Sequence, residues 1–592
     1  MDDAAGVIER IRAGIVGEDR VLAGPYGDCR LVYADYTASG RALDFVEDFI
    51  RASVLPLYAN THSDSSGTGR QTTALREQAR ALIHRAVGGG DEDVVIFTGA
   101  GATGAVNKLV GILGLHRETG SRSPAADARA SVAAPVTGAA GAPAAGRAGA
   151  ADRRTVVFVG PYEHHSNELP WRESAAQVVA IAADAEGGID QADLAEQLVR
   201  HADRPVRIGS FSAASNVTGL LSDVAGISAL LHAHGALAFW DYAAAAPYLP
   251  IRMRASAAGA GDHLDAVFLS PHKFVGGPQT PGVLVLRRDL VADQVPTAPG
   301  GGTVLFADPW SHRYLEDPVA REEAGTPAIV EAVRAGLVFA VKEAVGAAAI
   351  RAREEELWQR VRERWSQEPD IDILGSPRAP RLPIVSLRIR ADGQFLHHNF
   401  VVALLNDLFG IQARGGCSCA GPYGHRLLAI DRPLSRSFER EIQAGHAGIK
   451  PGWTRISFHY AMSETVRDYL IEAVVLVARY GQRMLADYGF DPESGAWHHR
   501  DGPGAAAVRL ADFDPTGGGG NGEAPRRAGE EVLAGQLERA RRLMAERPAC
   551  ADPGAEDEPD RPRLPAAVEA LRWFALPCGC LTDGDPGRRQ EA

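Results

Sequence analysis

The chain has 592 residues, more than a single domain usually holds, and its 45% hydrophobic and 23% charged residues give the balance of a globular protein. Its net charge of −13 disfavours nucleic acid and anionic membranes as partners. Six cysteines are too few for a disulfide scaffold, and no apolar stretch approaches a signal peptide core or the roughly 18 residues of a membrane span. The predicted location is the cytoplasm.

The first 118 residues predict helices around one buried strand. A short amphipathic helix and a turn are expected over 1–30, extended chain over 31–43, helices over 44–57, 73–88 and 102–116, and a strand over 93–99. Residues 119–151 are rich in Ala, Gly, Pro and Ser without apolar periodicity, which is typical of a flexible surface insertion.

After the insertion, short apolar runs alternate with helical stretches. The runs are "RTVVFVG", "QVVAIAA", "VRIGSFSA", "GALAFWDYA", "AVFLS" and "GVLVLR". This alternation predicts an α/β domain with a mostly parallel sheet. A long helical region begins near residue 327, and mixed elements follow it to about residue 488. These favour a smaller α+β domain.

Four regions follow from this pattern. An N-terminal segment that packs on the body spans 1–40, a large α/β domain spans 41–325, a small α+β domain spans 326–490, and a partly disordered C-terminal extension spans 491–592. Within the extension, "LRWFALP" is apolar enough to dock back on the body.

A lysine follows one of the buried strands. In "VFLSPHKFVGGPQTPG", Lys273 comes after an apolar run and before a glycine-rich turn. A lysine in this position can form a Schiff base with pyridoxal phosphate (PLP). By itself the pattern also fits a surface lysine that happens to follow a strand.

A carboxylate follows the preceding strand, about one βαβ step earlier. Asp241 in "FWDYAAAAPY" directly follows an apolar run, where a charge is costly unless it is paired. PLP needs such a carboxylate to keep its pyridine nitrogen protonated. A turn aspartate at a strand end is common, but the pairing with Lys273 favours the cofactor role.

Two further stretches suit the same cofactor. "IFTGAGATGAVNKL" reads as a strand, a glycine turn and a helix N-terminus, which together can bind phosphate through backbone N–H groups. Ser270 and His272 could add donors beside Lys273, and His164 in "PYEHHSNELPW" could stack on the ring. A glycine turn or a single histidine is weak evidence alone.

Taken in order, these pieces resemble a known family. "GATGAVN", "EHHSNELPW", "SNVTG", "WDYAA", "SPHKFVGGPQTPG", "GGGTV", "EAGTP", "ARGGCSCAG" and "TRISF" resemble the class V, fold-type I PLP enzymes, and within them the cysteine desulfurase and selenocysteine lyase group. The resemblance covers roughly residues 30–480. It implies a large domain with a mostly parallel, seven-stranded-type sheet flanked by helices, and a smaller α+β domain.

The resemblance also implies roles for single residues. Lys273 matches the Schiff-base lysine, Asp241 matches the pyridinium partner and His164 matches the stacking histidine. Ala102, Thr103, Ser270 and His272 match residues of the phosphate cup, Asn216 matches a residue that contacts cofactor and substrate, and Thr303 matches a residue that contacts the partner subunit's phosphate. Arg455 matches the arginine that binds the substrate carboxylate, Cys419 matches the attacking cysteine, and Arg414 matches the arginine upstream of it. A homodimer with shared sites, an amino-acid substrate similar to cysteine and a sulfur-acceptor protein are further implications.

Two positions depart from the family pattern. Ala244 stands three residues after Asp241, where relatives usually carry Gln or His, and alanine cannot donate a hydrogen bond to the cofactor. "GCSC" has two cysteines where relatives more often have one. The true substrate and the roles of Cys417, Cys578 and Cys580 therefore stay open.

The turn "ARGGCSCAGPYGHR" allows several interpretations. A zinc site of Cys417, Cys419 and His425 has an unusually tight Cys-x-Cys spacing. A disulfide between the two cysteines would be strained, and two small residues filling a turn is the plain alternative. Arg414 and nearby N–H groups would favour a thiolate, which makes a nucleophile the leading hypothesis.

The function that the resemblance implies is the conversion of L-cysteine to L-alanine, with a persulfide on Cys419. A different PLP reaction is the alternative: another C–S lyase, an epimerase or an aminotransferase. A cofactor-bearing protein that acts by binding is a further alternative, which Lys273 and Asp241 disfavour.

Overall fold

The structure is a computed structural model that describes residues 2–61, 65–116, 155–502, 510, 513–516, 526–548, 564–576 and 581. The chain divides into two compact units, here called unit 1 and unit 2. Unit 1 comprises Met1–Ala38, Asn216–Gly219 and Arg351–Ala592, and unit 2 comprises Ser39–Ser215 and Leu220–Ile350. The predicted insertion at 119–151 and the terminal Cys578 and Cys580 lie outside the described residues.

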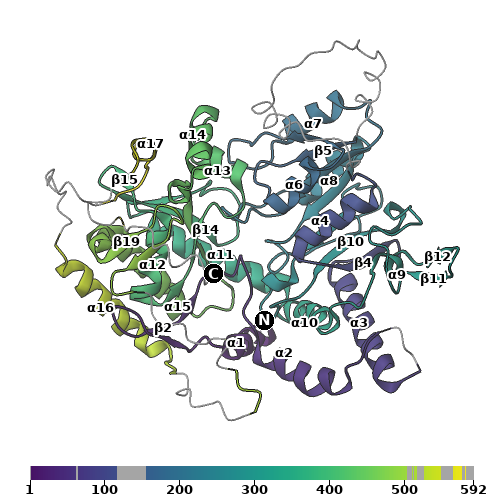
Figure 1. The fold of residues 1–592 in the computed structure, drawn as a ribbon, viewed down its shortest axis with the longest axis horizontal. Coiled ribbons are helices and arrows are strands. Elements are labelled where there is room, and N and C mark those ends of the chain that lie inside the picture. The colour runs from purple at the N-terminus through teal and green to yellow at the C-terminus, as the bar shows by residue number, and fades with distance from the viewer. Residues whose placement is uncertain are drawn as a thin grey trace. The chain divides into compact units, whose positions relative to one another are not determined.

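Unit 2 is built on a seven-stranded sheet (Figure 1). Its strands, in spatial order, are β4 (Asp93–Thr98), β10 (Gly282–Arg287), β9 (Ala266–Leu269), β8 (Leu237–Asp241), β7 (Arg207–Ser212), β5 (Val156–Val159) and β6 (Gln177–Ala180). Strand β10 runs antiparallel to both of its neighbours, and the other pairs are parallel. The mostly parallel sheet expected from the alternating pattern is thus confirmed.

Helices connect and flank these strands. They are α2 (Asp44–Phe49), α3 (Gly67–Ala86), α4 (Gly101–Ile112), α6 (Leu169–Arg172), α7 (Gln191–Arg200), α8 (Val224–Ala233), α9 (Pro318–Glu322) and α10 (Ile329–Val345). Helix α4 buries Ala105 and Leu109 in one hydrophobic cluster with Ile96 of β4 and Leu284 of β10. The apolar runs along the strands fit this burial because the sheet is covered.

Unit 1 contains a smaller antiparallel sheet of five strands. They are β13 (Ile371–Ile373), β14 (Ile384–Ala391), β18 (Trp453–Ser457) and β17 (Arg414–Gly416) in spatial order, with β15 (Gln394–Phe395) paired to β14. The helices of this unit include α1 (Asp2–Gly14), α12 (His398–Phe409), α13 (Gly421–Leu427), α14 (Arg432–Gln443), α15 (Glu464–Tyr480) and α16 (Leu533–Glu546). A parallel pair joins β16 (Ile411–Gln412) to β3 (Val32–Tyr33).

The helical region expected after residue 327 is broken into two helices. Helix α10 ends at Val345, and α11 runs over Ala347–Trp365. Gly346 lies between them with φ of 85°, a conformation that glycine adopts without the steric cost of a side chain. The sequence pattern misses this break because the apolar periodicity continues on both sides of the glycine.

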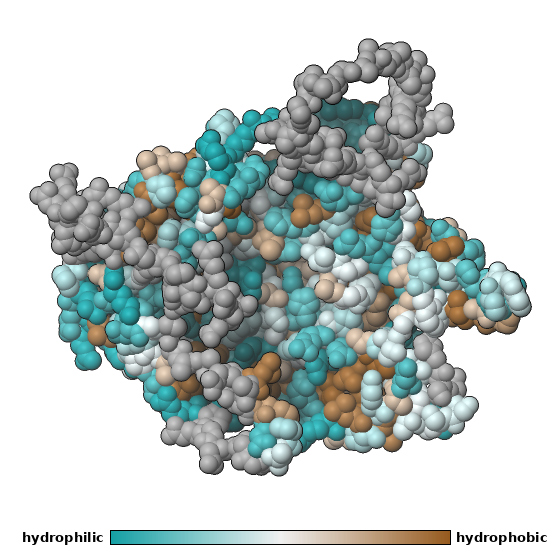
Figure 2. Space-filling model, in the orientation of Figure 1, coloured by the Kyte–Doolittle hydropathy of each residue, from teal (hydrophilic) through white to brown (hydrophobic). Residues whose placement is uncertain are grey.

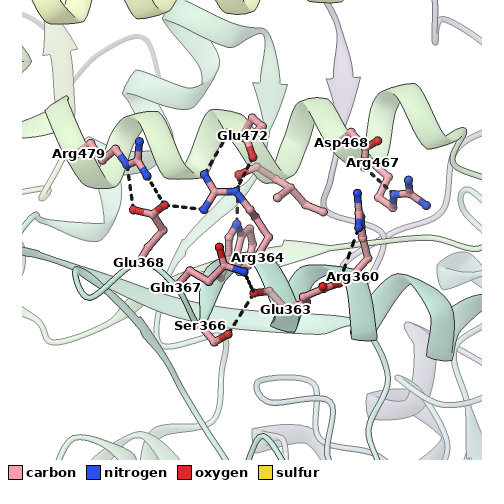
Figure 3. A network of polar contacts seen from close by, with 12 residues as sticks. Arg360, Glu363, Arg364, Ser366, Gln367, Glu368, Arg467, Asp468, Glu472 and Arg479 are labelled. Atoms are coloured by element: carbon pink, nitrogen blue, oxygen red, sulfur yellow. Dashed lines mark hydrogen bonds and ion pairs between the residues drawn. The ribbon is translucent and has the colours of Figure 1, made fainter.

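Ion pairs join the end of α11 to α15 in unit 1 (Figure 3). Arg364 Nε lies 2.7 Å from Glu472 Oε1, and Glu368 Oε1 lies 2.6 Å from Arg479 Nη2. The hydrogen bonds from Arg479 and Arg364 hold the pKa of Glu368 below its usual value. This network connects the two helices along their charged edge.

Part of the C-terminal extension packs into the core of unit 1. Phe574 is fully buried and bridges to Phe395, and Trp573 and Leu576 pack against the same cluster. The prediction that "LRWFALP" docks back is confirmed for its described residues. Within the described part of the chain, no helix combines the length and the apolarity that crossing a bilayer requires.

Candidate functional site

Asp241 is a buried carboxylate at the end of β8. It is 4% exposed, and its Oδ1 accepts a hydrogen bond of 2.7 Å from the backbone N–H of Ala243. Burial raises its pKa, against smaller opposing effects of that hydrogen bond and of the charge on Lys273. Among the described residues no donor reaches Oδ2. One oxygen is therefore left for a ligand that can donate a proton or a positive charge.

Lys273 follows the neighbouring strand β9, as the sequence predicted. It closes a single 3₁₀ turn, η5 (Pro271–Lys273), which Ser270 separates from the end of β9. The turn is fixed in place because the backbone N–H of Gly40 donates to the carbonyl of His272 at 2.8 Å. Burial, with the charge of Lys273, lowers the pKa of His272 to about 4, so this imidazole is neutral at physiological pH.

The start of helix α4 closes onto the same turn. The backbone N–H of Ala102 donates to Ser270 Oγ at 2.9 Å. Gly101 has φ of 52°, and a Cβ there would lie 2.9 Å from both Ser270 Oγ and His272 Cε1. Only glycine fits this approach, which brings the helix N-terminus against the two side chains predicted for the phosphate cup.

His164 is oriented by a short polar chain. Its Nδ1 accepts a hydrogen bond of 3.1 Å from the backbone N–H of Ser166, so a neutral ring carries its proton on Nε2. Ser166 Oγ lies 2.6 Å from Thr103 Oγ1 on α4. The structure thus links the predicted stacking histidine to a predicted phosphate residue.

These residues of unit 2 fit bound PLP. A helix N-terminus with Ser270 and His272 suits a phosphate, and the open oxygen of Asp241 suits a protonated ring nitrogen. Ala244 is buried and offers no side-chain donor, so the departure noted in the sequence persists in the structure.

Glu163 is a further buried carboxylate that the sequence reasoning missed. It accepts hydrogen bonds from Ser212 N–H at 2.9 Å, Ser212 Oγ at 2.6 Å and Asn167 Nδ2 at 2.6 Å. Ser212 pairs with Asp241 across the β7–β8 ladder. Burial raises the pKa of Glu163 to about 7, and the charge of Asp241 adds to the effect. Its position directly before His164 was the available signal.

Thr303 precedes an exposed hairpin of unit 2, β11 (Val304–Ala307) and β12 (His312–Tyr314). Thr303 is buried, and its hydroxyl donates to the carbonyl of Gly300 at 2.6 Å. The hairpin itself exposes Leu305, Phe306 and Trp310, whose exposed fractions are 63%, 58% and 89%. Figure 2 shows hydrophobic surface on this part of the molecule.

Arg455 and Arg414 share one carboxylate in unit 1. Arg455 on β18 is buried, and its Nη2 lies 3.0 Å from Asp35 Oδ1. Arg414 lies opposite Arg455 on β17, and its Nε lies 2.9 Å from Asp35 Oδ2. Burial lowers the pKa of Arg455, and Asp35 opposes that shift. The sequence reasoning chose both arginines but missed Asp35.

Asn216 joins this group to the cysteine turn. Its carbonyl accepts from Arg455 Nη1 at 3.0 Å, and its Nδ2 donates to the carbonyl of Ser418 at 2.8 Å. Ser418 and Cys419 both have positive φ, 52° and 54°, which is uncommon for residues with side chains. Trp453 Nε1 donates to Ser418 Oγ at 3.2 Å. These contacts hold a costly backbone conformation beside the cysteine.

Both cysteines of the turn are free thiols. Cys419 is exposed and Cys417 is half-buried, so the disulfide alternative does not hold. His425 instead faces the carbonyl of Gly421 and Ser435 Oγ, each at 2.8 Å. Within the described residues, these three side chains do not come together as a group of metal ligands. Cys419 is the more exposed of the two thiols.

Comparison with known proteins decides the family. Residues 139–468 match the family model described as Aminotransferase class-V. The chain belongs to this family. The resemblance predicted from the ordered motifs is confirmed, and with it the expectation of a PLP-dependent enzyme, since PLP is the cofactor of class V aminotransferases.

Several relatives of this chain carry the name "Probable cysteine desulfurase". It is 26% identical over 437 residues to a "Probable cysteine desulfurase" of Halobacterium salinarum, covering 73% of this chain and 92% of the relative. It is 27% identical over 398 residues to a "Probable cysteine desulfurase" of Streptomyces coelicolor, covering 66% and 84%.

Solved structures show the same fold. The cysteine desulfurase of Thermococcus onnurineus has a TM-score of 0.57 at 22% identity, covering 76% of this chain and 95% of that one. The cysteine desulfurase CsdA of Escherichia coli has a TM-score of 0.57 at 21% identity, covering 78% and 96%. The predicted fold-type I architecture is therefore confirmed.

Proposed function

We propose that this class V enzyme is a cysteine desulfurase that converts L-cysteine to L-alanine and takes the sulfur as a persulfide on Cys419. One observation carries the proposal. Asn216 hydrogen-bonds both to Arg455 and to Ser418, so an arginine suited to an α-carboxylate is linked to the residue before an exposed thiol. The names of the relatives support the same activity.

The residues of unit 2 would hold PLP and move protons. The N-terminus of α4, Ser270 and His272 would bind its phosphate, Asp241 its ring nitrogen, and His164 would stack on the ring. When bound, PLP supplies an electron sink for the pair released from the substrate Cα–H bond. Lys273 would take that proton and later return one, because an amine near the α-carbon can act as base and acid.

The residues of unit 1 would bind substrate and accept its sulfur. Arg455 would bind the α-carboxylate of cysteine, a task that suits a guanidinium. The thiolate of Cys419 would attack the substrate sulfur, forming an S–S bond as the Cβ–S bond breaks. The bonding pair stays with the three-carbon fragment, which leaves as alanine after protonation. Cys419 is left as a persulfide for a sulfur-acceptor protein.

The exposed hairpin supports a homodimer. Leu305, Phe306 and Trp310 would be costly in water, and a second copy of the chain would cover them. Such a pairing would also suit the predicted role of Thr303 toward the partner's phosphate. A cytoplasmic location, in which thiols stay reduced, is proposed for the same enzyme.

The test is an assay of alanine and sulfide released from L-cysteine in the presence of a reductant. The native enzyme should release both in equal amounts, and Cys419→Ala should lose most of this turnover. Cys417→Ala is the matched control, because its thiol lies two residues away on the same turn. Turnover that survives Cys419→Ala unchanged would favour the alternative of another C–S lyase, and the absence of PLP binding would overturn the proposal as a whole.

The buried Ala244 favours a second candidate. Without a side-chain donor three residues after Asp241, the enzyme could run a different PLP reaction on an amino acid, such as epimerisation or amino transfer. Substituting Ala244→Gln separates the two. A desulfurase should keep or gain cysteine turnover, whereas an enzyme tuned for another reaction should lose its own activity.

A further inference from the structure

Asp35 is the internal counterion of two arginines. Its Oδ1 lies 3.0 Å from Arg455 Nη2, and its Oδ2 lies 2.9 Å from Arg414 Nε. Arg455 is 3% exposed, and among the described residues Asp35 is the one carboxylate within ion-pair distance of it. A buried guanidinium without a partner is costly, so Asp35 stabilises Arg455 while no substrate is bound.

The position of Asp35 is fixed by its backbone. The N–H of Ala34 donates to the carbonyl of Gln412 at 2.9 Å, and the N–H of Ser457 donates to the carbonyl of Ala34 at 2.8 Å. The carbonyl of Asp35 itself accepts from Ala38 N–H at 2.9 Å. This segment therefore runs between β16 and β18, and the carboxylate cannot withdraw far from Arg455.

Arg455 still has bonding capacity. Its Nη1 donates to the carbonyl of Asn216 and its Nη2 to Asp35, but its buried Nε has no partner among the described residues. A buried N–H without an acceptor is rare in folded proteins. An incoming carboxylate would therefore bind a guanidinium that already carries one carboxylate and has a free N–H.

We propose that Asp35 sets the affinity of Arg455 for the substrate carboxylate, by competing for the same guanidinium; this inference rests on the proposed function. Two arginines and Asp35 carry a net charge of +1, which one substrate carboxylate neutralises. Two carboxylates on one guanidinium repel each other. Asp35 thus limits how tightly an amino acid, or the alanine product, is held.

Whether the loss of Asp35 strengthens or weakens ligand binding depends on which of its two effects on Arg455 is larger. Asp35 also orients Arg455, and losing that contact alone would weaken ligand binding. Arg455 keeps its hydrogen bond to Asn216 and its burial in the sheet, so its orientation is largely preserved without Asp35. The removal of a negative charge therefore dominates, and an Asp35→Asn enzyme should bind carboxylates more tightly.

The experiment measures binding to the full-length holoenzyme. Dissociation constants of L-alanine and L-alaninamide are compared for the native protein, Asp35→Asn and the control Asp28→Asn, whose exposed carboxylate pairs with Arg526 instead. We expect Asp35→Asn to bind L-alanine about 10-fold tighter and L-alaninamide unchanged. Unchanged or weaker binding of L-alanine would overturn the inference.

A second variant is expected to change the affinity for L-alanine in the opposite direction. Arg414→Gln leaves the charge of Asp35 less compensated, so it should bind L-alanine about 10-fold more weakly while binding of L-alaninamide stays the same. Arg414 is half exposed, so this variant is expected to fold even if Asp35→Asn does not. Equal losses for both ligands would indicate a structural role and would contradict the inference.

Turnover of L-cysteine, measured in parallel, keeps the two proposals separate. If the native enzyme releases no alanine from cysteine but the two variants shift alanine binding in opposite directions, the proposed function fails and the inference stands. If the enzyme is a desulfurase and neither variant changes alanine binding, the inference fails alone. If the native holoenzyme does not bind L-alanine at all, the role of Arg455 and with it the inference are overturned.

Discussion

The side-chain amide of Asn216 donates a hydrogen bond to the carbonyl of Ser418, across a distance of 2.8 Å. Ser418 and Cys419 have left-handed backbone conformations, and such conformations persist when surrounding contacts hold them. The contact therefore connects the conformation of the cysteine turn to Asn216, whose carbonyl also accepts a hydrogen bond from Arg455.

Asn216→Ala should release the cysteine turn. Without the bond to Ser418, the turn can relax to more favourable φ values and carry Cys419 away from its working position. A displacement of about 1 Å can lower a reaction rate about 100-fold, and we expect a loss of that order in sulfide release. Ser418→Ala is the comparison, because it keeps the carbonyl acceptor for Asn216 and loses only the hydrogen bond from Trp453 Nε1, so it should retain more activity. A larger defect in Ser418→Ala than in Asn216→Ala would count against this explanation.

The buried carboxyl group of Glu163 is expected to make the stability of the protein depend on pH. Its pKa is raised to about 7 by burial, so the folded protein binds this proton more tightly than the unfolded chain. The free energy of unfolding should therefore fall as pH rises from about 4.5 to 7, by at most roughly 3 kcal/mol from this group. Glu163→Gln removes the titration, so native and variant curves of stability against pH should diverge in this window. Parallel curves would mean that Glu163 keeps an ordinary pKa in the folded protein.

The buried ion pairs of Glu323 in unit 2 are expected to contribute to the free energy of unfolding. Its carboxylate lies 2.5 Å from Arg76 Nη2 and 2.9 Å from Arg80 Nη2, and these arginines hold its pKa low despite burial. Glu323→Gln leaves both arginines short of a counterion and should reduce the free energy of unfolding by about 3 kcal/mol, measured by denaturant titration. Glu77→Gln, an exposed partner of Arg80, should change it by less than about 1 kcal/mol. Similar effects of the two variants would contradict the assignment.

Substitutions of the exposed apolar side chains of the hairpin are expected to change the assembly of the protein. Replacing Phe306 and Trp310 by serine should convert the proposed dimer into a monomer, because these side chains supply apolar area that is exposed in a single chain. Light scattering on the separated protein measures the mass directly. Val199→Ser, an exposed valine on α7, is the control and should leave the mass unchanged. A native protein that is already monomeric would remove the basis of this prediction.

Much of the cofactor part of the site could be predicted from the sequence. Asp241 and Lys273 both follow apolar runs. Because the carboxyl ends of neighbouring parallel strands meet at one edge of a sheet, the sequence predicts that these two residues lie at the same edge. The antiparallel direction of β10 could not be predicted, because "GVLVLR" is an apolar run that suits either direction. The break at Gly346 was hidden by continuous helical periodicity.

The polar contacts that matter most in unit 1 could not be predicted. Asp35 and Arg455 are separated by 420 residues, and an aspartate after "VYA" resembles any strand-end residue. Asn216 belongs to a segment of four residues, Asn216–Gly219, that groups with unit 1 although its neighbours in sequence belong to unit 2. Local patterns carry no signal for such long-range pairs, which depend on tertiary packing. Glu163 was hidden for a similar reason, since a glutamate in a polar loop is usually exposed.

The proposed transfer of sulfur to Cys419 is tested most directly by mass spectrometry of the enzyme after brief exposure to L-cysteine, with peptides from the cysteine turn and from the C-terminal cysteines resolved. We expect one added sulfur atom on Cys419 in the native enzyme, none on that turn in Cys419→Ala, and retention of the modification in Cys417→Ala. Release of alanine with sulfur on Cys417 alone, or with no persulfide on either cysteine of the turn, would contradict it.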